Sequence, residues 1–165
     1  MSSQAKPKQV IDVAIGIVVD KMSPFNALTQ HQTDTPSAPA ATNHQKHILI
    51  TQRKAEQVLG GYWELPGGKV EPDETPRDAV VRELLEETGM HVQPIAALPT
   101  TQHHYDHAHV RLIPFICEHT AGKPQPLQVD QVRWVTPQQL ADYDFPLASL
   151  PVLAELLRWL EDNQP

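Results

Sequence analysis

Three glutamates lie close together in one short stretch of the chain, and their spacing suits a cation site. Glu83, Glu86 and Glu87 fall within about 100° of one another when projected on a helix. Carboxylates that converge in this way do not all stay ionised without a counter-charge. Clustered oxygen ligands suit Mg²⁺ or Mn²⁺, which also neutralise phosphates. The residue types therefore indicate a divalent-metal site for phosphate chemistry, with a solvated acidic helix face as the alternative.

The segment that carries these glutamates has the end signals of a helix. Thr75 suits the N-cap, Pro76 the first helical position and Asp78 the capping box. Gly89 suits the left-handed residue that ends a helix. We therefore predict a helix over residues 75–88, with the glutamates on its solvent side. The side chains expected to face the core are Val80, Val81, Leu84 and Leu85.

Apolar runs and turn residues predict the elements around this helix. Strands are expected at 10–19, 47–53, 92–104, 109–117 and 132–135, and a final amphipathic helix at 150–160. Because Pro114 has no N–H to donate, we expect its strand to lie at an edge or to be bulged. Strands and helices interleaved in this order predict an α/β sandwich around a mixed sheet.

The length of 165 residues suits one domain. We assign the domain to residues 10–161, between flexible ends at 1–9 and 162–165. Residues 20–46 are polar and show no periodicity, so we predict a mobile insertion there. A substrate lid is one interpretation of this insertion. A tolerated insertion is favoured, because lengthening such a loop costs little entropy.

The composition argues against several classes of partner. A net charge of −7 gives no basic footprint for a DNA or RNA polymer. No apolar run approaches the roughly 20 residues that span a membrane. The single cysteine, Cys117, excludes an internal disulfide framework and suits a reducing compartment. No cleavage site for export follows the N-terminal residues, so we expect a cytoplasmic protein, with a monomer favoured.

At this point the residues match a known family. Residues 68–90 form a 23-residue pattern that resembles the Nudix signature at every defined position. These positions are Gly68, Glu74, Arg82, Glu83, Leu84, Glu86, Glu87, Gly89 and Met90. The wider stretch 48–90, which includes the run from Tyr62 to Lys69, is similar to the MutT-like branch.

The resemblance implies a Nudix-type α/β/α sandwich around a mixed β-sheet. It also implies Mg²⁺-dependent hydrolysis of a nucleoside triphosphate, such as 8-oxo-dGTP, to a nucleoside monophosphate and pyrophosphate. Such an enzyme would cleanse the nucleotide pool. Another nucleoside diphosphate derivative is the alternative substrate. A non-catalytic nucleotide-binding module is the alternative class of function. Such a module is expected to lack signature glutamates, whereas this sequence has all of them.

The resemblance also assigns roles to individual residues. It implies that Glu83, Glu86 and Glu87 hold Mg²⁺, or Mn²⁺, with the Gly67 carbonyl, and that Glu74 is an auxiliary acidic group. Arg82 would orient a glutamate through an ion pair. The residues expected to contact the nucleotide are Arg53, Leu65, Lys69 and Ser149.

Two positions depart from the pattern of the MutT-like branch. Gln128 stands where relatives often carry a glutamate that binds metal or acts as a base, and Asp130 is the candidate replacement. A solvated loop aspartate is the alternative, as is activation of water by Glu83 or by the metal ions. Ser149 stands where relatives offer Asn or Asp to the base, which weakens a specific assignment to 8-oxo-dGTP. Ser149 could instead cap the final helix.

Overall fold

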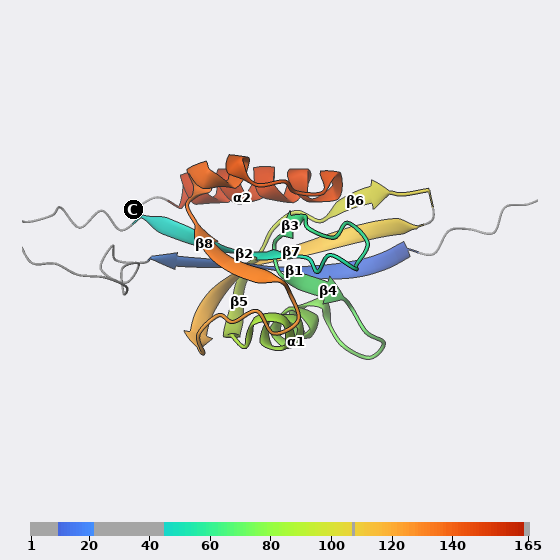
Figure 1. Ribbon diagram of the computed structural model, residues 1–165, viewed down its shortest axis with the longest axis horizontal. Coiled ribbons are helices and arrows are strands. Elements are labelled where there is room, and N and C mark those ends of the chain that lie inside the picture. Colours follow the sequence, from blue (N-terminus) through green and yellow to red (C-terminus); the bar gives the residue numbers. More distant parts are fainter. Residues whose placement is uncertain (1–9, 22–44, 107, 164–165) are drawn as a thin grey trace, which may run out of the picture.

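A computed structural model describes residues 10–21, 45–106 and 108–163 of the chain. Within these ranges eight strands form one mixed sheet, and a helix covers each face: α1 lies on one side and α2 on the other (Figure 1). The predicted α/β sandwich around a mixed sheet is thereby confirmed. The strands are β1 (Val10–Lys21), β2 (Lys46–Gln52), β3 (Trp63–Glu64), β4 (Gly67–Lys69), β5 (His91–Ala97), β6 (Thr101–His104), β7 (His109–Ala121) and β8 (Gln131–Val135). The helices are α1 (Pro76–Thr88), the 3₁₀ turns η2 (Pro137–Asp142) and η3 (Leu147–Ser149), and α2 (Leu150–Asp162).

Strand β1 organises the sheet because it pairs with three other strands. It runs parallel to β7 from Val10, opposite His109, to Val18, opposite Cys117. It also runs antiparallel to β4 near its middle and to β2 near its end. On the far side of β7 lie β5 and β6, while β3 and β8 both pair with β2. The short strand β4 is thus fixed directly beside the centre of the sheet.

Two apolar clusters, one on each face, hold the helices to the sheet. Alternate residues of β1 point to opposite faces, as strand geometry requires: Ala14 and Val18 pack with α1, whereas Ile17 packs with α2. From α2, Val152, Leu153, Leu156 and Leu160 complete the second cluster. Both helices therefore pack firmly on the sheet, and α1 has little freedom to move relative to β4.

Helix α1 has the predicted ends but a different rotation about its axis. The Thr75 hydroxyl accepts a hydrogen bond from the Asp78 amide in a complete capping box, and Gly89 ends the helix with φ of 70°. The prediction that Leu85 faces the core is wrong, since Leu85 is 40% exposed. The same prediction is confirmed for Val80 and Leu84, which are buried, while Val81 is only partly buried; Ala79 and Thr88 are buried as well. This rotation turns Glu83 and Glu87 toward the sheet, so their predicted solvent-side placement is also wrong.

The predicted strand at 92–104 is divided into β5 and β6, which both pair with β7. The expectation that Pro114 lies in an edge strand is wrong, because β7 has neighbours on both sides. Pro114 accepts a hydrogen bond from the Leu98 amide, so its nitrogen faces the interruption between β5 and β6. The missing N–H of Pro114 therefore lies where the hydrogen bonding between neighbouring strands is already interrupted. A shift in the pairing register lies in β5, between Pro94 and Ala96.

The predicted insertion at 20–46 lies outside the described residues for 22–44. Its two ends belong to strands, and Lys21 and Lys46 are direct partners in the antiparallel pair of β1 and β2. The flexible start assigned to 1–9 also lies outside the described residues. At the other end, α2 includes Asp162, and the Asn163 carbonyl accepts a hydrogen bond from Lys46. No helix in the described ranges is long and apolar enough to cross a membrane.

We predict that residues 22–45 can be replaced by a two-residue Asn-Gly turn. Lys21 and Lys46 face each other across an antiparallel pair, which is the geometry that such a turn closes. The shorter loop costs less closure entropy, by about 0.6 kcal/mol for each halving of its length, so the free energy of unfolding should rise by up to about 2 kcal/mol. Thermal unfolding monitored by circular dichroism measures this. A fall of many degrees in Tm would contradict the prediction and would show that the removed residues stabilise the fold.

Candidate active site

The site forms where α1 passes close to β4, and two glycines allow this approach. Gly67 has φ of 155°, a backbone conformation that favours glycine, and a Cβ there would overlap the Ala14 carbonyl oxygen. A Cβ at Gly68 would overlap the carboxylate of Glu83. The side-chain space of both residues is therefore occupied by β1 on one side and by an acidic side chain of α1 on the other.

Glu87 points into this narrow space and is held by the backbone. Its Oε2 accepts a hydrogen bond of 3.1 Å from the Gly67 amide. Burial, followed by the nearby negative charge of Glu64, raises the pKa of Glu87 to about 8, although the Gly67 hydrogen bond acts in the opposite direction. Near neutral pH the site therefore takes up a proton on Glu87 unless a cation compensates its charge.

Arg82 binds the outer glutamates of the site together. Its guanidinium donates to both carboxylate oxygens of Glu74, at 3.1 and 2.7 Å, and to Glu83 at 2.9 Å. It also reaches Glu86 at 3.4 Å and the Lys69 carbonyl at 3.1 Å. The Arg82 contact lowers the pKa of Glu74, whereas burial raises the pKa of Glu83 despite the same arginine. The orienting role that the resemblance implied for Arg82 thus has the required geometry.

A fifth acidic residue, Glu64 in β3, was not assigned a role from the sequence. Its carboxylate is 17% exposed and forms an ion pair of 2.7 Å with Arg53. Burial raises the pKa of Glu64, and the charge of Arg53 partly offsets this. Strand alternation could have revealed it: Trp63 and Leu65 face the core beneath α2, so Glu64, between them, must face the opposite side.

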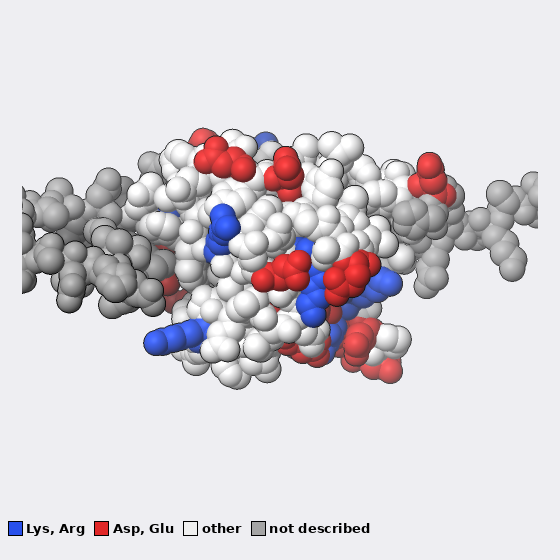
Figure 2. Space-filling view, viewed as in Figure 1, with Lys and Arg blue, Asp and Glu red and all other residues white. Residues whose placement is uncertain are grey.

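The charges of the site suit a divalent cation. Five carboxylates, those of Glu64, Glu74, Glu83, Glu86 and Glu87, share two guanidiniums, those of Arg53 and Arg82. Figure 2 shows acidic and basic side chains gathered over β4 and the segments beside it. An all-oxygen donor set with excess negative charge fits Mg²⁺ or Mn²⁺. Among the described residues, no three acidic, His or Cys side chains are already arranged to hold one metal ion. Cation binding therefore requires Glu83 and Glu86 to turn away from Arg82.

The four residues expected to contact a nucleotide differ in their availability. Lys69 is exposed to solvent, whereas the guanidinium of Arg53 already forms an ion pair with Glu64. Leu65 is only 3% exposed, so little of its side chain can touch a ligand. Ser149 is partly exposed at the N-cap position of α2, but its side chain makes no capping hydrogen bond. The alternative role of Ser149 as a helix cap is therefore not supported.

Backbone contacts position Gln128 and Asp130 beside the acidic residues. The amides of Leu127 and Gln128 donate to the Glu87 carbonyl, and the Asp130 amide donates to the Gln52 carbonyl. The loop thus runs from the end of α1 to β2 and satisfies carbonyls that the helix leaves free. The Asp130 side chain is exposed at this rim.

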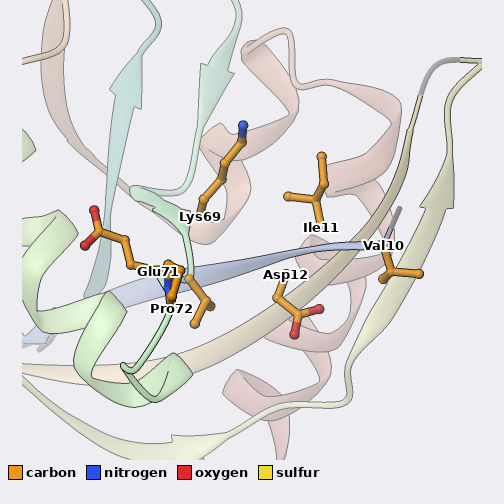
Figure 3. A pocket seen from close by; sticks show the side chains of 7 residues that line it. Val10, Ile11, Asp12, Lys69, Glu71 and Pro72 are labelled. Atoms are coloured by element: carbon orange, nitrogen blue, oxygen red, sulfur yellow. The ribbon is translucent and has the colours of Figure 1, made fainter. Parts of the chain in front are cut away.

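A groove of about 460 Å³ lies beside β4, at the start of β1 (Figure 3). Residues 10–12 and 69–72 line it, and Lys69 and Glu71 point in different directions from its wall. Arg111 forms an ion pair with Asp12, one of the lining residues. The groove adjoins the acidic site through Lys69 but contains none of its five carboxylates.

Known proteins are similar to this chain in sequence and in fold. The model of the NUDIX domain family matches residues 38–155. The 8-oxo-dGTP diphosphatase of Escherichia coli K12 is 35% identical over 116 residues, which cover 70% of this chain and 90% of that protein. The CTP pyrophosphohydrolase of the same organism is 33% identical over 106 residues, or 64% of this chain and 78% of that protein. The solution structure of the E. coli ORF135 protein has a TM-score of 0.68 at 25% identity and covers 96% of this chain and 95% of that one.

We predict that Glu87→Gln stabilises the metal-free protein at high pH. The raised pKa of Glu87 means that the unfolded chain loses this proton near pH 4.5 and the folded chain only near pH 8. Stability is therefore lost as the pH rises through this window, and the amide removes the loss while it still accepts from Gly67. About 1.4 kcal/mol per pKa unit, over the rise from 4.5 to about 8, and about 2–4 °C per kcal/mol give a gain in Tm on the order of 10 °C at pH 9.

Thermal unfolding in chelator at pH 4.5 and pH 9 tests this prediction, with Glu86→Gln as the matched control. The Glu86 side chain is 44% exposed, so its amide variant should have little effect at either pH. Equal effects of the two variants at pH 9, or a gain for Glu87→Gln that persists at pH 4.5, would contradict the assignment of burial to Glu87.

Proposed function

The chain belongs to the NUDIX domain family and is a Nudix hydrolase; on this basis we propose that its substrates are nucleoside triphosphates, oxidised purine nucleotides among them. It would convert them to a nucleoside monophosphate and pyrophosphate and so cleanse the nucleotide pool. The observation that carries the proposal is the group of five carboxylates served by two arginines. Such an excess of negative charge is stable only with cations, and cations are what a polyphosphate chain requires.

Support for the class of substrate comes from two relatives. One is named for 8-oxo-dGTP and the other for CTP, and both names describe cleavage within a nucleoside triphosphate. Their bases differ in size and in hydrogen-bonding edge, so the reaction at the phosphates is their common feature. We propose the same reaction for this chain and treat the choice of base as a separate question. We place it in the cytoplasm with the free nucleotides.

We propose that Glu83, Glu86 and Glu87, with the Gly67 carbonyl, hold Mg²⁺ at the site. When bound, the ion supplies Lewis-acid stabilisation of charge on the diphosphate oxygens. Arg82 keeps Glu83 and Glu86 near Glu74 before binding, which limits the rearrangement that binding requires. Lys69, exposed at the end of β4, is the side chain available to a phosphate oxygen. The protein thus contributes positioning and charge stabilisation to the reaction.

The attacking water needs a proton acceptor, for which we propose Asp130. Its amide is fixed by a hydrogen bond to the Gln52 carbonyl, next to Arg53, and its side chain is exposed and forms no ion pair with another described residue. Gln128, two residues before, cannot accept a proton in this way because an amide is not basic. Glu83 is the second candidate, since it lies next to Gly68 within the acidic group.

We predict that Glu86→Gln and Glu87→Gln each lower kcat by more than about 100-fold, since groups that only orient a metal ligand already cost about 10- to 100-fold when removed. Steady-state hydrolysis of 8-oxo-dGTP, dGTP, CTP and ADP-ribose in Mg²⁺ measures this, and chelator should abolish it. Glu71→Gln is the control, because Glu71 contacts Glu74 only through its backbone: its amide donates to the Glu74 carboxylate and its carbonyl accepts from the Glu74 amide. Full activity in chelator would refute the cation assignment, and preferred cleavage of ADP-ribose would refute the proposed substrate class.

We also predict that Ser149→Asn raises the ratio of kcat/KM for 8-oxo-dGTP over dGTP by a few-fold. A hydroxyl rotates to donate or accept, so it distinguishes the two base edges poorly, whereas an amide offers a fixed donor and acceptor. One hydrogen bond gained is worth about 1 kcal/mol, which corresponds to a few-fold in this ratio. Ser149→Ala is the control. An unchanged ratio in both variants would show that Ser149 does not contact the base.

A further inference from the structure

Glu64 is an acidic residue of the site to which the proposed reaction assigns no role. Its carboxylate is 17% exposed and accepts a hydrogen bond of 2.7 Å from Nη1 of Arg53. It lies on the face of β3 opposite to Trp63 and Leu65, which belong to the cluster beneath α2. Its negative charge nevertheless helps to raise the pKa of Glu87, one of the proposed cation ligands. Glu64 is therefore at the boundary between the acidic group and Arg53.

Arg53 connects Glu64 to the loop of residues 54–61, which joins β2 to β3. The Nε of Arg53 donates to the Val58 carbonyl at 2.9 Å, while Nη1 of the same guanidinium is bound to Glu64. The backbone of Arg53 closes the loop at its base through bonds with Gly61 and Tyr62, at 3.1 and 3.0 Å. One side chain thus spans the loop and joins it to the acidic group.

The conformation of this loop depends on hydrogen bonds and not on apolar packing. Val58 is 76% exposed, Leu59 40% and Tyr62 39%, so the loop buries few of its large apolar side chains. Leu59 has φ of 58°, a conformation that is unfavourable for a side chain with a Cβ. Since packing does not fix the loop, loss of the Arg53 contacts should loosen it.

We propose that Glu64 is a positioning residue that, through Arg53, fixes loop 54–61 as a wall of the nucleotide site. The loop and the residue that follows it expose the apolar side chains of Val58, Leu59 and Tyr62, against which the planar base of a nucleotide would pack. This inference rests on the proposed function for the identity of the ligand. Glu64 then determines how tightly the nucleoside is bound and is not itself a ligand of the cation.

Glu64→Gln tests the proposal because it keeps the shape of the side chain and removes its charge. The amide can still accept from Arg53, but the attraction between the two opposite charges is lost at a position that is only 17% exposed, so we expect KM to rise on the order of tenfold. The kcat and the Mg²⁺ concentration for half-maximal rate should each change by less than about threefold, because Glu64 acts on the cation ligand Glu87 only through its charge. Glu56→Gln, an exposed carboxylate on the same loop, is the matched control and should alter none of these values.

Hydrogen exchange of the ligand-free protein supplies a readout that needs no activity. The amides of Gln57, Gly60 and Tyr62, which are bonded within the loop, should exchange faster in Glu64→Gln and in Arg53→Lys. The double variant should be no worse than Arg53→Lys alone, because both changes break one connection. If no nucleotide is hydrolysed, the proposed function fails, while faster exchange still supports the positioning role.

Three results would overturn the proposal. A lower kcat with a higher Mg²⁺ requirement would make Glu64 a ligand of the cation. Unchanged exchange in Glu64→Gln would show that the ion pair does not hold the loop. Faster exchange without a rise in KM would show that the loop is held by Glu64 but does not contact the nucleotide.

Discussion

The close approach of α1 to β4 is the constraint on which the rest of the site depends. It is possible because residues 67 and 68 have no side chains, so that the acidic face of the helix lies directly against the strand. The same approach removes Glu83 and Glu87 from much of the solvent, and burial raises the pKa of both. The fold thus creates an electrostatic imbalance that a divalent cation corrects, and affinity for that cation follows from packing as much as from the ligands themselves.

Two arginines, Arg53 and Arg82, form the ion pairs that hold the acidic group before a cation is present. Arg82 joins the carboxylates at the start and middle of α1, and Arg53 joins Glu64 to the loop that follows β2. Glu87 interacts electrostatically with both sides and accepts its hydrogen bond from the Gly67 amide. Arg82 therefore keeps Glu83 and Glu86 at the site before a cation is present, and both side chains must turn from it when the cation binds.

Local signals were enough to predict the ends of α1, the glutamates and the family. The capping box of Thr75 and Asp78 and the glycine at 89 act within a few residues, so the sequence contains the whole interaction. The rotation of α1 was not predictable in this way, because it depends on how closely β4 and β1 approach the helix. The same is true of Pro114, whose strand is tolerated inside the sheet only because β5 and β6 leave a gap opposite it. The side of the sheet on which Glu64 lies could be predicted from strand alternation. Its ion pair with Arg53 could not, because it depends on a turn of the chain that composition does not specify.

The parallel pairing of β1 with β7 has a consequence for how the chain folds. Val10 lies opposite His109, so the central pair of the sheet joins segments that are almost a hundred residues apart. Contacts of such high sequence separation slow folding, because the entropy of closing the intervening chain is lost before the pairing stabilises anything. Helix α1 has strong local signals and can form early, but β4 is fixed only when β1 has found its partner. During synthesis on the ribosome, β1 can pair with β2 and β4 as they emerge, but its other edge must wait for β7, so the centre of the sheet is completed only after helix α1 has been made.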